Sequence, residues 1–329
     1  MVGSGVILLY HRIATLPSDP QLLAVTPAHF NEHLEVLRDA GVPMSLSRLL
    51  GANRERRLPP RAVAVTFDDG YADNFDEGGP LLARHDVPAT VFVTTAYVGG
   101  EAEFWWDDLE RLLLGRGSFP PTLRLRIGDA VHQWDLGDAA CCDDTAVRRD
   151  RGWNVECRGD PTPRHRAYRD LCELLRRVSG DDRPAVIDDL TRLAGATSAG
   201  RQTHRPVSRE RIARASADAL IEVGAHTVTH SMLAALPPAA QRSEIADSKA
   251  AVRDITGADP AGFSYPFGSR SDYTRTTVAL VQEAGFRFAC ANVPGGVSPK
   301  SDSWQLPRLL VRDWDGETFA RRLQEHLAG

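Results

Sequence analysis

Short apolar runs alternate along the chain with longer segments in which apolar residues recur every three or four positions. Val6–Tyr10, Val63–Phe67 and Ala89–Val93 are runs of the first kind and predict buried strands. The segment from Thr26 to Gly41 is of the second kind, with an N-cap threonine followed by proline, and a glycine stop. The alternation predicts βα units built around a mainly parallel sheet.

The same alternation resumes after Ser208. With helices that end at Gly257 and Gly285, we expect four further strands, Leu220–Gly224, Phe263–Tyr265, Phe286–Cys290 and Leu306–Val311. A last helix carries apolar residues on one face, Phe319, Leu323 and Leu327. An α/β chain with about seven strands in this order is close to a closed (β/α) barrel.

Between Trp105 and Ser208 the alternation of strand-like and helix-like segments is interrupted. Alternating residues on both sides of a Gly128-Asp129 turn predict a β-hairpin, and two segments with helical spacing follow it. We therefore expect residues 1–104 and 209–329 to form the barrel. Residues 105–208 are expected to form an inserted α+β subdomain that caps the barrel mouth.

Composition narrows the class of protein. The chain has 329 residues, 42% of them hydrophobic and 25% charged, which is typical of a globular protein. A net charge of −5 gives no basic footprint for nucleic acid or an anionic membrane, so neither partner is expected. The five cysteines include no Cys-x-x-Cys spacing, which favours reduced thiols. No signal peptide or membrane span is visible, so we expect a cytoplasmic location.

Two adjacent carboxylates follow one of the predicted strands. Asp68 and Asp69 come directly after Val63–Phe67, and Gly70 permits a tight turn behind them. Neighbouring carboxylates repel unless a cation or a shared proton intervenes, so a metal on one would leave the other to accept a proton. A solvated Asp-Gly turn is the alternative, because this dipeptide is common in turns.

Two histidines four residues apart follow another strand. His226 and His230 could converge on one cation, whereas ordinary surface or core histidines are the alternative. Because barrel enzymes build their sites at the carboxyl ends of strands, we expect Asp69 to join them in a three-ligand metal site. This donor set suits Zn²⁺ first, and Co²⁺, Ni²⁺, Mn²⁺ or Fe²⁺ also fit it.

The stretches Thr66-Phe67-Asp68-Asp69-Gly70 and His226-Thr227-Val228-Thr229-His230 resemble two signatures of the polysaccharide deacetylase family, the NodB homology domains of carbohydrate esterase family 4. The resemblance covers the two barrel segments and leaves the insert out. It implies a deformed (β/α) barrel and a metal-dependent N-deacetylase activity. It also implies that Asp68 is the general base, and that one divalent metal ion is held by Asp69, His226 and His230.

The family's third motif normally begins with an arginine that is missing from the corresponding stretch here, Phe263-Ser264-Tyr265-Pro266-Phe267-Gly268. The resemblance implies that the backbone N–H of Phe267 contacts the oxyanion. We expect Arg308 to take over from the missing arginine by pairing with Asp68, with an ordinary structural salt bridge as the alternative.

The general acid of the family usually comes from a late Leu-x-His motif, which this chain lacks near its C-terminus. His11, directly after the first strand, resembles the acid of the permuted family members that deacetylate poly-N-acetylglucosamine. An imidazole with a pKa of ~6.5 suits that role, and a core histidine is the alternative. Trp106 and Tyr265 could line a sugar groove with their flat rings, or simply anchor their segments.

We therefore expect a metal-dependent amide hydrolase that removes the N-acetyl group from an N-acetylated amino sugar. Because no export signal is visible, the expected substrate is a small molecule or oligosaccharide, such as a cytoplasmic glycan or a glycosylated natural-product intermediate. A hydrolase of a non-sugar amide or imide, a deacetylase of a polymeric exopolysaccharide and a non-catalytic sugar-binding protein are the alternatives. The sequence does not indicate an oligomeric state.

Overall fold

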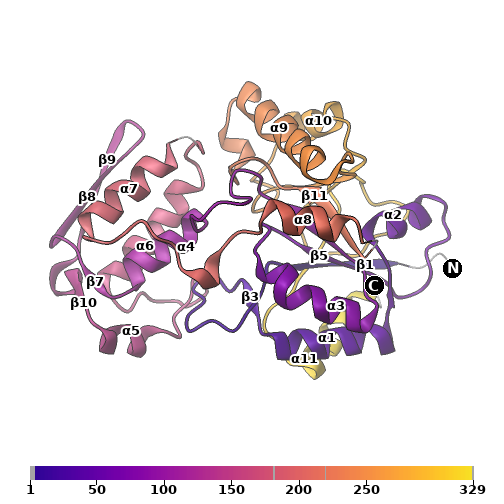
Figure 1. Ribbon diagram of the computed structural model, residues 1–329, viewed down its shortest axis with the longest axis horizontal. Helices are drawn as coiled ribbons and strands as arrows, with labels where there is room; N and C mark the ends of the chain where they lie inside the picture. The colour runs from indigo at the N-terminus through magenta and orange to yellow at the C-terminus, as the bar shows by residue number, and fades with distance from the viewer. Residues whose placement is uncertain (1–3, 181, 219, 328–329) are drawn as a thin grey trace. The chain divides into compact units, whose positions relative to one another are not determined.

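The computed structural model describes residues 4–180, 182–218 and 220–327 (Figure 1). Contacts divide the chain into two compact units. The barrel unit comprises Met1–Thr15, Leu23–Gly99 and Val207–Gly329, and the inserted unit comprises Leu16–Leu22 and Gly100–Pro206. Leu16–Leu22 was expected in the barrel, but Gln21 Nε2 donates to the hydroxyl of Tyr168 at 2.8 Å, which ties this segment to the inserted unit.

A parallel sheet forms the centre of the barrel unit. Its strand order is β13-β12-β11-β6-β5-β1-β14, and β4 pairs with β5. The strands are β1 Gly5–Tyr10, β4 Val42–Pro43, β5 Ala62–Phe67, β6 Ala89–Val93, β11 Ile221–Ala225, β12 Gly262–Ser264, β13 Phe288–Cys290 and β14 Leu309–Leu310. An isolated parallel β-bridge joins Cys290, at the end of β13, to Leu306. It links one edge strand of the sheet to the segment that leads into β14, the other edge strand. The predicted deformed (β/α) barrel is therefore confirmed.

The central strands are buried along their whole length. Every residue of β1, β5 and β6 is buried, which explains why these strands read as continuous apolar runs. The predicted strand Leu306–Val311 is wrong in its extent, because only Leu309–Leu310 is a strand. Its first half turns instead toward the other edge of the sheet, where the N–H of Arg308 donates to the carbonyl of Val293 at 3.0 Å.

Helices cover the outside of the barrel unit, with α1, α3 and α11 grouped on one side and α9 and α10 on another (Figure 1). Thr26 caps α1 as predicted, because its side chain accepts from the N–H of His29. The helices are α1 Pro27–Ala40, α2 Leu46–Arg54, α3 Gly79–His85, α8 Arg209–Ser216, α9 Pro238–Thr256, α10 Arg275–Glu283 and α11 Gly316–Leu327. A short strand pair, β2 Arg12–Ile13 with β3 Ala24–Val25, and a π-helical turn over Asn74–Gly78 complete this unit.

The inserted unit contains the predicted hairpin and the two predicted helices. Leu123, Leu125 and Ile127 alternate with exposed residues along the first hairpin strand, so one face of the hairpin is buried. The elements are α4 Trp105–Leu109 with a π-helical turn Glu110–Leu114, β7 Gly117–Ser118, β8 Thr122–Ile127, β9 Ala130–Asp135, β10 Cys141–Cys142, α5 Asp144–Asp150, α6 Pro163–Leu175 and α7 Arg183–Leu193.

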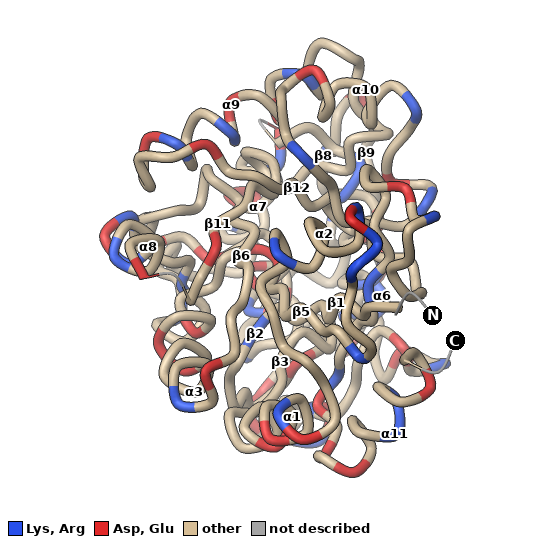
Figure 2. The backbone as a smooth tube through the Cα atoms, turned by 90° about the vertical axis from the view of Figure 1, so that its right-hand side faces the viewer, with Lys and Arg blue, Asp and Glu red and all other residues tan. Residues whose placement is uncertain are grey.

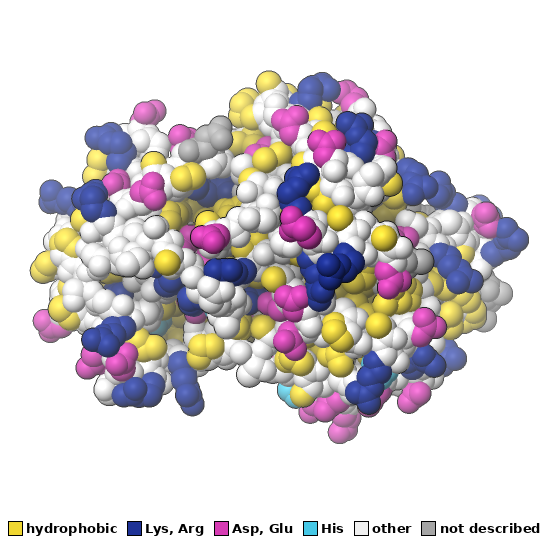
Figure 3. Space-filling view, in the orientation of Figure 1, with side chains coloured by type: hydrophobic (Ala, Val, Ile, Leu, Met, Phe, Trp, Pro, Cys, Tyr) yellow, Lys and Arg dark blue, Asp and Glu magenta, His cyan; other side chains and the backbone are white. Residues whose placement is uncertain are grey.

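Charged residues of both signs are interleaved along the helices (Figure 2). The face seen in Figure 3 likewise mixes basic and acidic side chains. This distribution agrees with the small net charge and gives no single-sign surface on that face. Among the helices that the structure describes, none combines the length and the apolar character needed to cross a bilayer. The five cysteines are all free thiols.

His33, buried against the barrel, makes the stability of the fold depend on pH. Its Nε2 donates to the carbonyl of Trp314 at 2.7 Å, so its Nδ1 accepts from the hydroxyl of Tyr10 in the neutral ring. Burial lowers the pKa of His33 to about 4, below the ordinary value of about 6.5 of the unfolded chain. The stabilisation is therefore complete above pH ~6.5 and is lost as pH falls toward the folded pKa.

When the pH falls from 6.5 to 4, the free energy of unfolding should decrease less in the His33→Gln variant than in the parent. The two decreases should differ by about 3 kcal/mol. Urea unfolding across this pH range measures it, and His326→Gln on the last helix is the control. Identical pH slopes for the parent and His33→Gln would contradict the expectation.

Candidate metal centre and active site

The parallel sheet brings polar residues from separate strands to its carboxyl edge. His11 follows β1, Asp68 and Asp69 follow β5, His226 follows β11, and Ser264 ends β12. In a parallel sheet these ends lie on one side, which is where α/β proteins bind their ligands. The candidate site therefore arises from the topology of the barrel unit.

The turn after β5 directs the side chain of Asp69. The backbone at Asp69 has a positive φ of 72°, and the N–H of Gly70 donates to the carbonyl of Asp68 at 2.9 Å, which is the geometry of a γ-turn. Gly70 also has a positive φ, and a Cβ there would lie 2.9 Å from Cγ1 of Val93. Only glycine suits this position, and the N–H of Thr94 holds the carbonyl of Asp69 at 3.0 Å.

The loop that carries the two histidines is held by a carboxylate from α9. The backbone N–H groups of Val228 and Thr229 donate to Oε2 of Glu244 at 2.8 and 2.9 Å. Thr227 and His230 have positive φ angles of 65° and 58°, conformations that cost about 1–3 kcal/mol each for residues other than glycine. Glu244, which the sequence analysis did not select, therefore contributes to fixing a strained loop.

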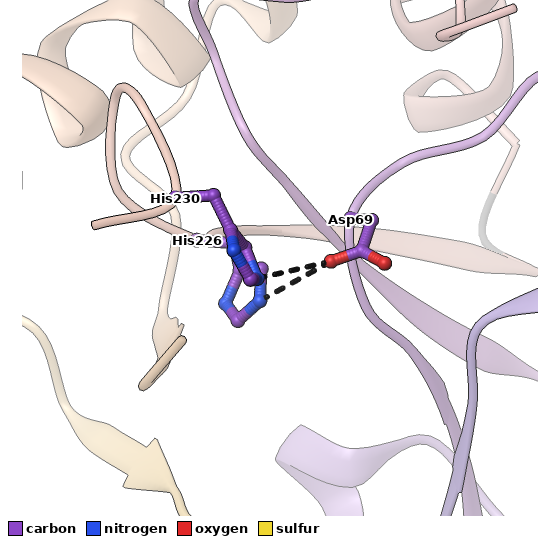
Figure 4. Close-up of side chains that lie close together, drawn as sticks. All are labelled: Asp69, His226 and His230. Carbon is purple, nitrogen blue, oxygen red and sulfur yellow. Dashed lines mark ion pairs between the residues drawn. The ribbon is translucent and has the colours of Figure 1, made fainter. Parts of the chain in front are cut away.

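Asp69, His226 and His230 converge in the structure (Figure 4). Oδ1 of Asp69 lies 3.6 Å from Nε2 of His226 and 3.3 Å from Nε2 of His230. The carbonyl of Ser264 accepts a hydrogen bond from Nδ1 of His226 at 2.7 Å. Nδ1 therefore carries the proton, which leaves the Nε2 lone pair of the neutral ring directed toward Asp69, as metal-binding histidines require.

The charge balance of this cluster fits a divalent cation. Asp69 is buried, and among the described residues no lysine or arginine pairs with its carboxylate. Burial opposes its ionisation, but hydrogen bonds from His226 and His230 hold the pKa of Asp69 well below its ordinary value when these rings also carry a proton on Nε2, the position that a cation would take instead. A second cluster in the inserted unit, formed by Asp107, Glu110 and His204, differs because Arg201 already lies 2.9 Å from the carboxylate of Glu110. The first cluster fits a metal ion, as the sequence analysis expected.

Asp68 is held by the arginine that was expected to pair with it. Nη1 and Nη2 of Arg308 donate to Oδ1 and Oδ2 of Asp68 at 2.8 and 2.7 Å, and both side chains are buried. Burial raises the pKa of Asp68, but Arg308 and then His226 outweigh it and hold that pKa below its ordinary value. The carboxylate next to the candidate metal site is therefore ionised and fixed in orientation.

The backbone around His11 is tied to the turn that follows Asp69. Nδ2 of Asn74 donates to the carbonyl of His11 at 2.7 Å, and Asp73 pairs with Arg12 at 2.9 Å. Burial lowers the pKa of His11, which the charges of Asp69 and Asp68 partly offset. The structure therefore brings His11 into the electrostatic field of the two carboxylates.

The three expected substrate contacts lie in different environments. Phe267 has a positive φ of 61°, and its ring centroid lies 4.8 Å from that of His230, so this residue adjoins the candidate metal site. Tyr265 is 1% exposed and its hydroxyl donates to the carbonyl of Trp304, so it is part of the barrel wall. Trp106 is buried in the core of the inserted unit, where it stacks on Phe104.

Comparison with known proteins agrees with this geometry. Residues 55–115 and 194–289 match the family described as polysaccharide deacetylase. The matched ranges include Asp68, Asp69, His226 and His230, whereas His11 and Arg308 lie outside them. The poly-beta-1,6-N-acetyl-D-glucosamine N-deacetylase of Escherichia coli (strain K12) is 30% identical over 86 residues, which cover 26% of this chain and 13% of the relative. A Bacillus subtilis (strain 168) relative is 32% identical over 97 residues, which cover 28% of this chain and 33% of the relative, so the chain spans a third or less of these two relatives.

Solved structures share the fold over nearly the whole chain. IcaB from Ammonifex degensii aligns with a TM-score of 0.58 at 17% identity, covering 98% of this chain and 97% of that one. Streptococcus pyogenes deacetylase PplD in complex with acetate aligns with a TM-score of 0.57 at 16% identity, covering 98% and 99%. At these identities the likeness concerns the fold. The family match over residues 55–115 and 194–289, which contains both motifs at the carboxyl edge of the sheet, identifies this part of the chain as a polysaccharide deacetylase domain.

Proposed function

We propose that this chain is a metal-dependent hydrolase that removes the acetyl group from an N-acetylated amino sugar. The observation that carries the proposal is the pairing of a buried Asp69–His226–His230 cluster with a second carboxylate, Asp68, held by Arg308. One ionised group is thus available to hold a cation, and the adjacent one to move a proton. The activity named for the relatives from Escherichia coli and Staphylococcus aureus, N-deacetylation of poly-beta-1,6-N-acetyl-D-glucosamine, supports the same reaction class.

Asp69, His226 and His230 would hold one divalent ion, with zinc as our first choice from the donor set. Such an ion, when bound, polarises an amide carbonyl and lowers the pKa of water toward neutrality. Asp68 accepts the proton from the water whose oxygen attacks the acetyl carbonyl carbon. Because Asp68 is ionised and fixed by Arg308, it is ready for this transfer without reorientation.

Phe267 and His11 complete the proposed reaction. Phe267 has a positive φ and its ring lies beside that of His230, and its backbone N–H would donate to the developing oxyanion. His11 would give a proton to the amine nitrogen as the C–N bond breaks, releasing acetate and the free amino sugar. Burial lowers the pKa of His11, and the charges of Asp69 and Asp68 offset this only in part.

The carrier of the acetamido sugar is a separate part of the proposal. The activity of these relatives favours a β-1,6-linked poly-N-acetylglucosamine chain, the polymeric alternative, over the small soluble conjugate expected first from the sequence. We therefore propose an oligomeric or polymeric N-acetylglucosamine substrate, with small acetamido-sugar conjugates as the second class to test.

Acetate release tests this proposal directly. We expect zinc-loaded protein to release acetate from β-1,6-linked N-acetylglucosamine oligomers, to lose this activity after chelation, and to regain it when Zn²⁺ is restored. Chito-oligomers, N-acetylglucosamine, nucleotide-linked acetamido sugars and a non-sugar acetanilide complete the panel. Release from the acetanilide alone, or no release from any compound with metal bound, would overturn the proposed function.

A further inference from the structure

Ser264 makes contacts with both halves of the proposed site. It is the last residue of β12 and is fully buried. Its Oγ lies 3.0 Å from Oδ2 of Asp68 and 2.9 Å from Nη2 of Arg308, and its backbone carbonyl accepts from Nδ1 of His226. One residue, 196 positions away from Asp68 in the sequence, therefore contacts the proposed base, the arginine that orients it and one proposed metal ligand.

The direction of each hydrogen bond follows from the chemistry of the groups. A guanidinium can only donate, so the Ser264 hydroxyl accepts from Arg308 and donates its single proton to Asp68. Oδ2 of Asp68 thus receives two hydrogen bonds, from Arg308 and Ser264, and Oδ1 receives one from Arg308. Three donors from two residues therefore hold the carboxylate, and Ser264 adds a contact from a second direction to the two parallel bonds of the arginine.

The backbone of Ser264 is itself fixed by the sheet. Its strand pairs in parallel with β13, with Ser264 opposite Cys290, and the N–H of Tyr265 donates to the carbonyl of Cys290 at 3.1 Å. The neighbouring strand β11 leads directly into His226. The hydroxyl is therefore presented from a rigid element, which is the arrangement that holds a catalytic group within a fraction of an ångström.

We propose that Ser264 is a positioning residue for the deacetylation, its hydroxyl orienting the carboxylate of Asp68 toward the proton that it must take. This inference rests on the proposed function. The side chain acts on Asp68 and Arg308, while the contact with His226 uses the backbone only, so changing the side chain separates the two contacts.

The test compares Ser264→Ala and Ser264→Thr with the parent, all loaded with Zn²⁺, on the panel compound that yields the most acetate. A hydrogen bond to a charged group of this kind predicts a fall in kcat of about 10- to 100-fold for Ser264→Ala, with KM within about twofold. Ser264→Thr keeps the hydroxyl and should recover most of the loss. Thr66→Val is the matched control, because Thr66 lies 3.3 Å from Nη1 of Arg308 and does not contact Asp68.

Two further readouts distinguish positioning from a general structural role. Bound zinc per chain and thermal unfolding of the metal-free protein should stay close to the parent in Ser264→Ala. In an Asp68→Asn background, Ser264→Ala should leave kcat unchanged, since the group that it orients is already disabled.

Three results would overturn the inference while the parent is active. They are parental kcat in Ser264→Ala, loss of zinc together with activity, and an equal fall in kcat in the Asp68→Asn background. A parent that releases no acetate from any compound would instead overturn the proposed function and the role of Ser264 with it.

Discussion

Asp68→Asn is expected to lower kcat for acetate release by about 100-fold or more, the contribution typical of a general base. The amide has nearly the same shape as the carboxylate and can still accept from Arg308, but it cannot take a proton from water at neutral pH. KM should change little, because the lost interaction develops only in the transition state. Steady-state acetate release by the zinc-loaded variant measures both constants.

A second variant separates the base from the metal site. Asp68→Asn should bind zinc as the parent does, whereas His226→Ala should lose both zinc and activity, because His226 is one of three proposed ligands. Metal content by mass spectrometry after dialysis gives the comparison. Asp68→Asn protein that keeps its zinc and at least a third of the parental kcat would remove Asp68 from the role of base.

Local patterns in the sequence predict much of this site. Asp68-Asp69-Gly70 and the His226–His230 spacing each stand directly after a buried apolar run, and parallel strands deliver such positions to one edge. The arginine partner of Asp68 could also be predicted, because the missing arginine of the third motif left a carboxylate that needed a cation. The structure places Arg308 there, 240 residues away in the sequence.

Contacts between distant elements could not be read from the same patterns. Glu244 lies on α9 among solvent-facing positions, and nothing in helical periodicity distinguishes a carboxylate that caps a distant loop. Ser264 was visible as a polar residue at the end of a predicted strand, the signal that identified the aspartates, but a lone serine there has many explanations. Long-range pairing also decided the short extent of β14, since residues before Leu309 bond toward β13 instead.

The aromatic residues show that the kind of side chain alone does not identify which residues contact a substrate. Trp106 and Tyr265 were selected because flat rings suit sugars, yet each is buried and packs on another aromatic ring. A sequence gives the character of a ring but not its exposure, which depends on how the surrounding segments pack. Phe267, selected through its backbone, adjoins the proposed metal ligand His230.

Arg308→Met is expected to destabilise the protein by about 3–5 kcal/mol, because it leaves the buried carboxylate of Asp68 without its cation. The parental pKa of Asp68 lies below the ordinary value, so the pair stabilises the fold above pH ~4 and loses this effect as pH falls through the lowered pKa. Without Arg308, burial raises that pKa, so the acid limb of the kcat profile should move to higher pH. Urea unfolding and a pH–rate profile measure the two effects.

Two companion variants test the cause of this loss. Arg308→Lys keeps a charge but not the two-point geometry, so it should recover stability more fully than kcat. Combining Arg308→Met with Asp68→Asn removes the unpaired charge, and this double variant should unfold at a higher urea concentration than Arg308→Met alone. If Arg308→Met instead keeps parental kcat and an unchanged acid limb, the arginine serves as a structural ion pair. The ionisation of Asp68 would then depend on the neighbouring histidines and the cation that they hold.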